Sequence, residues 1–78
     1  MNVEVEEKWQ VAKNNLLQMI GNQQPVSCLI SGWEPVDLET GLRWLQSSIY
    51  EGFMVDFIVR QSISGSTITF AISEPNGE

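Results

Sequence analysis

The sequence contains no histidine and only one cysteine, Cys28, among its 78 residues. A single thiol cannot form an intramolecular disulfide or a CxxC motif. Without histidine there can be no Ser–His triad, no Cys–His dyad and no histidine-containing zinc site. We therefore expect a protein that is not an enzyme and has no metal and no cofactor. We interpret Cys28 as a small apolar side chain within a strand.

Basic residues are also scarce, because four lysines and arginines stand against ten aspartates and glutamates, for a net charge of −6. Binding to nucleic acid or to an anionic membrane surface depends on lysine and arginine, so the composition argues against both. A negative field favours a basic protein partner, which includes nucleic-acid-binding proteins. The same charge also favours solubility without any partner, and the composition does not separate these two roles.

Long apolar runs are missing as well. No stretch approaches the roughly 20 residues that a helix needs to cross a bilayer. The first residues, MNVEVEEKW, are acidic and lack the basic and then apolar layout of a signal peptide. We expect one small domain over residues 1–78, located in the cytoplasm.

Two amphipathic helices are predicted by apolar residues at spacings of three and four. The first covers about residues 4–20, and the second covers about residues 38–50 and begins after Asp37, a favoured N-cap. Gly41 lies inside the second helix, where we expect another element to approach closely. The two apolar stripes consist of Val5, Trp9, Ala12, Leu16 and Ile20 in the first helix, and Leu38, Leu42, Leu45 and Ile49 in the second.

Three strands are predicted by alternation of apolar and polar residues, over about residues 25–31, 53–62 and 67–73. The short segment around Gly65 is typical of a hairpin between the last two strands. The helices and strands therefore follow one another in the order α-β-α-β-β.

This order predicts an α+β fold, a two-layer sandwich with both helices on one face of a three-stranded mixed sheet. We expect the first strand to run parallel to the second through a right-handed crossover, and the second and third to form the antiparallel hairpin. The strand order is 1-2-3 or 1-3-2, and the apolar residues on both faces of the second strand favour it as the centre. A sheet of three strands leaves two edges unpaired.

The loop SGWEPVDLETG, residues 31–41, lies between a strand and a helix N-terminus, a place where anions often bind. Glu34, Asp37 and Glu39 occupy this place, and no glycine-rich phosphate-binding motif is present. Their spacing also lacks the pattern of a calcium loop, so we assign them to helix capping and solvation. Trp33 either caps the end of the core or is exposed, and the sequence favours neither.

Aromatic residues of the second helix suggest one partner-binding surface. Trp44 lies roughly 130° from the centre of the leucine stripe, at ~100° per residue, among small polar neighbours. An exposed tryptophan in such surroundings is typical of an interface anchor, and Tyr50 and Arg43 lie on a neighbouring flank. The alternative is that Trp44 packs against the first helix or a terminal segment.

The uncovered face of the sheet suggests a second surface. Its apolar residues Leu29, Met54, Ile58 and Ala71 lie among serines and threonines, with Asp56 and Arg60. Apolar patches of this kind often mark partner or dimer surfaces. The alternative is an ordinary solvated face that carries a few apolar residues.

These observations favour a small, acidic, non-enzymatic protein-binding protein that inhibits or modulates a basic, nucleic-acid-binding partner. Phage- or plasmid-type inhibitors and immunity proteins share this size and charge, which is an analogy of profile alone. The alternative is a homo-oligomeric structural or accessory subunit that pairs through its sheet face or a strand edge. The candidate partner-binding residues are Trp44, Tyr50, Arg43, Trp33, Glu34, Met54 and Ile58.

Overall fold

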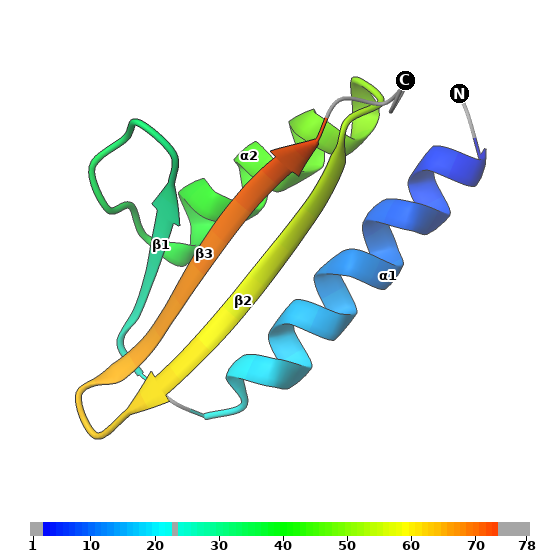
Figure 1. Ribbon diagram of the computed structural model, residues 1–78. Helices are drawn as coiled ribbons and strands as arrows, with labels where there is room; N and C mark the ends of the chain where they lie inside the picture. The colour runs from blue at the N-terminus through cyan, green and yellow to red at the C-terminus, as the bar shows by residue number, and fades with distance from the viewer. Residues whose placement is uncertain (1–2, 23, 74–78) are drawn as a thin grey trace.

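The computed structural model describes residues 3–22 and 24–73 and confirms the α+β class and the α-β-α-β-β order (Figure 1). The predicted bounds differ from the observed ones by a few residues at most. The elements are α1 (Val3–Ile20), β1 (Val26–Ile30), α2 (Leu38–Tyr50), β2 (Met54–Ser62) and β3 (Gly65–Ser73).

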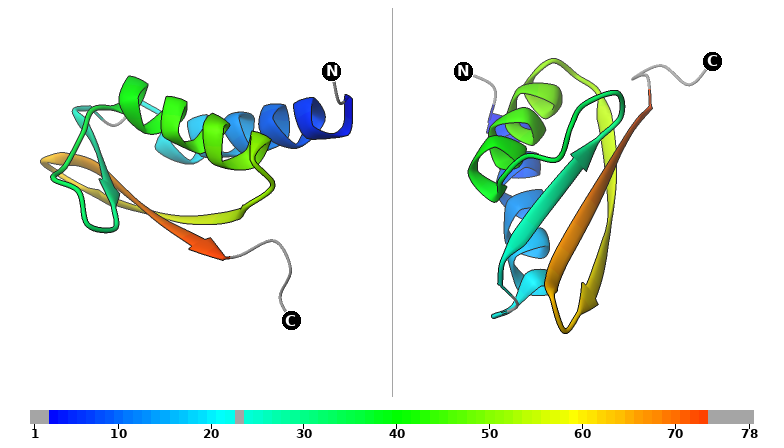
Figure 2. Two further views of the ribbon diagram at one scale, coloured as in Figure 1. Left: turned by 90° about the horizontal axis from the view of Figure 1, so that it is seen from above. Right: turned by 90° about the vertical axis from the view of Figure 1, so that its left-hand side faces the viewer.

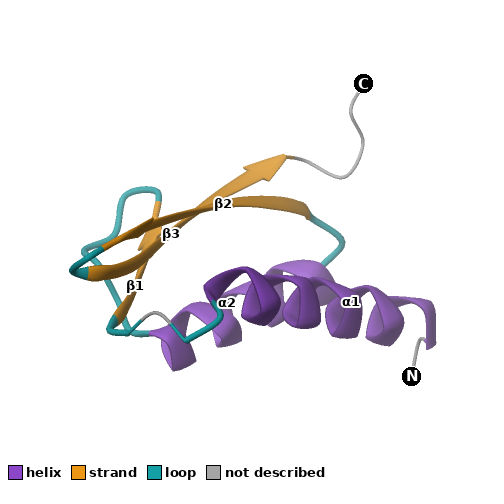
Figure 3. Cartoon of the chain, turned by 90° about the horizontal axis from the view of Figure 1, so that it is seen from below, coloured by secondary structure: helices purple, strands orange, loops and turns teal. Residues whose placement is uncertain are grey.

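Both helices lie on one face of the sheet, as Figure 2 shows from above, and no helix of the described residues lies on the opposite face (Figure 3). The core lies between these two layers because the predicted helix stripes and the alternate strand residues face one another. This confirms the two-layer sandwich. The buried apolar side chains are Trp9, Leu16, Ile20, Cys28, Ile30, Leu45, Ile68 and Phe70.

The strand order is β1-β3-β2, so the last strand occupies the centre of the sheet. β3 runs parallel to β1, with Cys28 opposite Ile68, and antiparallel to β2, with Phe57 opposite Phe70. The predicted hairpin between β2 and β3 is confirmed. The prediction that β1 runs parallel to β2 is wrong, because β1 is parallel to β3 and the two outer strands run in opposite directions. β2, which its apolar residues favoured as the centre, is an edge strand.

The loop between β1 and α2 explains why β1 and β2 run in opposite directions. After β1 the chain turns, with the Trp33 N–H donating to the Ile30 carbonyl at 2.8 Å, and returns along β1. Cys28 and Val36 then exchange two backbone hydrogen bonds of 2.8 and 2.9 Å. The loop therefore reverses the chain before the helix begins, so α2 runs in the same direction as β1 and β2 returns against it (Figure 1). Asp37 caps α2 as predicted, because its Oδ1 accepts from the Thr40 N–H at 2.9 Å.

α2 lies unusually close to β1 at Gly41. A Cβ atom on Gly41 would stand 2.4 Å from the Cys28 Sγ, which confirms the expected close approach at this glycine. The Cys28 side chain is fully buried. Burial, together with the charge of Asp37, raises the pKa of the Cys28 thiol to about 11, so the thiol stays protonated at neutral pH. These properties fit its interpretation as a small apolar core residue.

Candidate functional site

Trp44 of α2 packs against the sheet instead of standing free. Its ring lies 5.3 Å from that of Phe70 in β3, centroid to centroid and tilted by 46°, and its side chain is half-buried. Arg43 beside it is exposed and forms an ion pair of 2.9 Å with Glu39 one turn away. Trp44 therefore contacts the central strand, which neither of its two predicted environments included.

Tyr50 joins the end of α2 to α1. Its hydroxyl donates to the Glu6 carboxylate, which also accepts from the Gln10 amide at 3.0 Å. The hydrogen bond from Tyr50, followed by that from Gln10, holds the pKa of Glu6 below its ordinary value. The same contact raises the pKa of Tyr50. The polar end of Tyr50 thus has a structural role between the helices.

Tyr50→Phe is expected to raise the pKa of Glu6 toward its ordinary value, because the main hydrogen bond to the charged form is lost. A carboxyl whose pKa is lowered by folding stabilises the protein above its unfolded-state pKa, and this contribution disappears as the pH falls through the folded-state pKa. The variant should therefore lose less stability on acidification than the wild type. Carboxyl-detected NMR titration of Glu6 measures the shift, and an identical curve in both proteins would contradict the contact.

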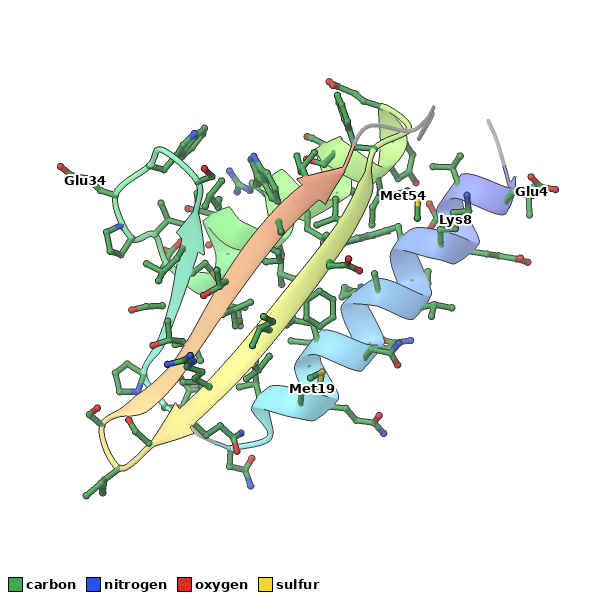
Figure 4. The ribbon with its side chains drawn as sticks, in the orientation of Figure 1. Glu4, Lys8, Met19, Glu34 and Met54 are labelled. Carbon is green, nitrogen blue, oxygen red and sulfur yellow. The ribbon has the colours of Figure 1, made fainter. Side chains whose placement is uncertain are left out.

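Trp33 and Glu34 lie on the loop between β1 and α2, away from the other candidates. Trp33 is 56% exposed, which resolves the two alternatives in favour of exposure. Glu34 stands at the outer part of this loop, directed away from the sheet (Figure 4). Among residues 3–22 and 24–73, no group of three acidic, cysteine or histidine side chains is placed to hold a metal ion.

The open face of the sheet does bring candidate residues together. The register places Leu29 of β1 and Ile58 of β2 on either side of Thr69, so these three form a row across all three strands. Met54 and Ile58 are 66% and 64% exposed. A shallow hollow of about 650 Å³ lies over this row, and it is lined by Leu29, Ile58, Arg60, Gln61, Ser62, Thr67 and Thr69.

The hollow combines apolar area with polar groups. Its lining residues include no carboxylate, thiol or imidazole that could act as a general acid or base beside the hydroxyl groups of Ser62, Thr67 and Thr69. Leu29 and Ile58 supply apolar area, the threonines supply hydroxyl groups, and Arg60 supplies five N–H donors. Apolar area bordered by polar groups is the usual composition of a protein–protein contact.

Sequence reasoning missed a second concave surface, a groove of about 580 Å³ between α1 and β2. On α1, Glu4, Lys8, Val11 and Asn15 are spaced by four, three and four residues, which is a helical stripe beside the core stripe. Because three of the four are polar, the pattern is that of a solvated flank. The groove is lined by Glu4, Glu7, Lys8, Val11, Ala12, Asn15, Val55 and Phe57.

Comparison of the chain with protein-family models, with curated proteins and with solved structures found no match. Within the described ranges, no helix has the length and apolar character required to cross a membrane.

Proposed function

We propose that this chain is a non-enzymatic protein-binding protein and that the open face of its sheet contacts the partner. The observation that carries the proposal is the row of Leu29, Thr69 and Ile58. Leu29 in it is half-buried, whereas Thr69 and Ile58 are exposed, as are Met54 and Arg60 beside the row. Exposed apolar groups that are gathered on one face and bordered by polar ones are characteristic of interaction surfaces. On the core side of the same sheet, the half-buried Trp44 packs against the buried Phe70.

The partner is a basic protein in this proposal. The net charge of −6 attracts a basic surface over long range and raises the association rate, while the apolar row supplies short-range affinity. A nucleic-acid-binding protein has such a basic surface, since it neutralises phosphates with lysine and arginine. By covering that surface, this acidic chain would inhibit or modulate its partner's binding to nucleic acid.

The test is capture of the partner from a lysate at several salt concentrations, with two variants of equal added charge. Ile58→Asp places a carboxylate in the middle of the open face. Ile63→Asp places one at the fully exposed tip of the β2–β3 hairpin. We expect capture to weaken as salt increases, because the Debye length falls from ~10 Å at 0.1 M to ~3 Å at 1 M. Ile58→Asp should reduce capture about tenfold or more, equivalent to ~1.4 kcal/mol, and Ile63→Asp should behave like the wild type.

Thermal unfolding of both variants is the control, since the open face lies outside the core and neither change should unfold the protein. If capture does not depend on the salt concentration, the negative charge of the chain does not contribute to binding of the partner. Equal capture by Ile58→Asp and the wild type would remove the open face from the interface.

A further inference from the structure

The helix layer of this molecule extends beyond the sheet on the β2 side. Two helices packed at an interaxial distance of ~8–10 Å, each ~10 Å wide, cover about 20 Å. Three strands at ~4.8 Å spacing cover about 14 Å. Figure 1 shows α1 beyond β2, on the side away from β3, and Figure 3 shows it in the same layer as α2. α1 therefore overhangs the outer edge of β2.

The groove of about 580 Å³ lies under this overhang. Val55 and Phe57 of β2 point toward the helix layer and yet are only half-buried, because that layer is displaced outward. Val11 of α1 faces the same space and is 59% exposed. Four apolar side chains from two elements thus line the groove, those of Val11, Ala12, Val55 and Phe57.

The edge of β2 supplies backbone hydrogen-bonding groups to this groove. β2 pairs with β3 along its whole length, Met54–Ser62, and forms the outer strand of the sheet on that side. In an edge strand, alternate residues direct their N–H and C=O groups away from the sheet. The other edge differs, because Val36 pairs with Cys28 and covers part of β1.

We propose that an extended segment of a partner protein binds in this groove and adds to β2 as a fourth strand, packed on α1. One added strand of ~4.8 Å brings the sheet to the width of the helix layer. The strand hydrogen-bonds to the free edge of β2, and every second side chain points into the groove toward Val11, Val55 and Phe57.

Charge defines the chemistry of the segment. Glu4 and Glu7 line the groove together with a single cation, Lys8, and the whole chain carries −6. Figure 4 shows Glu4 and Lys8 at the N-terminal end of α1, with Lys8 near Met54 at the start of β2. Apolar residues therefore suit the positions of the segment that point into the groove, and basic residues at the alternate positions complement the net charge of the chain.

A second copy of this chain does not fit the groove. Two copies paired through their β2 edges would each bring an overhanging α1 helix over the edge of the other copy's β2, so that the two α1 helices meet. Packed helices need ~8–10 Å between their axes, which this arrangement does not provide. Both copies would also carry a charge of −6. This surface is the edge of β2, so the proposal is independent of the open-face binding proposed above.

The first test uses a synthetic peptide of eight residues, alternating valine and lysine, with both ends blocked and a fluorescent label. Two further peptides are N-methylated at the valines only or at the lysines only, which removes the N–H donors along one edge of an extended strand. In anisotropy titrations, we expect one N-methylated peptide to bind like the parent. The other should bind more weakly than the parent by a factor of about ten or more. Equal binding by all three would overturn the addition of a strand.

The second test changes the groove while matching the added charge. Val11→Lys places an ammonium group in the groove, whereas Leu17→Lys places one on another side of α1, roughly 120° away at ~100° per residue. We expect Val11→Lys to weaken binding of the parent peptide about tenfold and Leu17→Lys to change it by less than about twofold. Equal weakening by both variants, with both still folded by circular dichroism, would overturn the groove as the site.

Sedimentation of the wild type completes the test. We expect the protein to be a monomer at micromolar concentration. In a separate hydrogen-exchange measurement, the amides of β2 should exchange more slowly when the peptide is added. A stable dimer with those amides already protected would overturn the assignment of a partner segment, since a second copy would then cover the edge.

Discussion

Replacing Gly65 with alanine is expected to lower the free energy of unfolding by about 3 kcal/mol or more. Gly65 begins β3 with a φ of +128°, in a region that side chains rarely adopt. A Cβ atom there would lie 2.3 Å from the backbone oxygen of Pro25. That oxygen also accepts the Ser66 N–H at 2.9 Å, so it cannot move without disturbing the start of the β1–β3 pairing.

Urea unfolding measures this effect, and Gly21→Ala is its control. Gly21 also has a positive φ, +61°, but a Cβ atom on it would meet nothing within 4 Å. The control should therefore lose only the conformational cost, about 1–2 kcal/mol. A 78-residue domain has a total stability of only ~4–12 kcal/mol, so the loss at Gly65 is a large share. Equal losses at both glycines would contradict the close contact with Pro25.

Gly41→Ala is expected to cost about 2 kcal/mol or more, even though alanine favours a helix over glycine by ~1 kcal/mol. The new Cβ atom would stand 2.4 Å from the Sγ and 2.9 Å from the Cβ of Cys28, whose side chain is fully buried and cannot withdraw. α2 must therefore move away from β1. Thermal unfolding followed by circular dichroism should show a lower melting temperature, by roughly 4–8 °C per kcal/mol for a domain of this size.

A double-mutant cycle with Cys28→Ala identifies the cause. Removing the sulfur alone leaves a small cavity and should cost about 1 kcal/mol. In the double variant the sulfur no longer meets the new methyl group. The loss of unfolding free energy in the double variant should therefore be smaller than the sum of the two single losses, by about 1 kcal/mol or more. Simple additivity would show that the cost of Gly41→Ala arises elsewhere.

Gly65 and Gly41 each lie where two segments of the chain come into close contact. The sequence predicts the segments themselves but only part of how they pack together. The spacing of Trp9, Leu16 and Leu45 predicts the helices and their buried faces, because helical periodicity is a local property. The alternation in β2 and β3, with Gly65 where they join, predicts the hairpin for the same reason. Gly41 indicated a close neighbour without indicating that this neighbour is Cys28.

The direction of β1 could not be predicted, because it depends on a pairing within the loop. Gly32 and Pro35 indicate a turn, but nothing local to Val36 shows that it pairs back onto Cys28 and reverses the chain. Because the loop reverses the chain direction before α2 begins, α2 runs in the same direction as β1. In a β-α-β unit the helix would run in the opposite direction to the strand before it. The last strand then occupies the centre, where Ile68 and Phe70 are buried.

The candidate site was predictable where it depends on strand alternation and not where it depends on packing between layers. Alternation places Met54 and Ile58 on the open face, as observed. A helical projection locates Trp44 around α2 but contains no information on the strand beneath it, so the contact with Phe70 was missed. The groove beside Val11 was missed because it results from the relative widths of the two layers.

The central claim is that the open face of the sheet contacts a partner protein. Its most direct test is a pair of NMR spectra, one of methyl and one of aromatic signals, of the labelled chain with and without the purified partner from the capture experiment. The methyl signals of Met54 and Ile58 should shift or broaden on binding. Those of Met19 on α1 and Ile63 at the hairpin tip, which are exposed elsewhere, should stay unchanged. Unchanged Met54 and Ile58 signals, with shifts instead at the Trp44 indole and the Tyr50 ring, would contradict the claim and place the partner on α2.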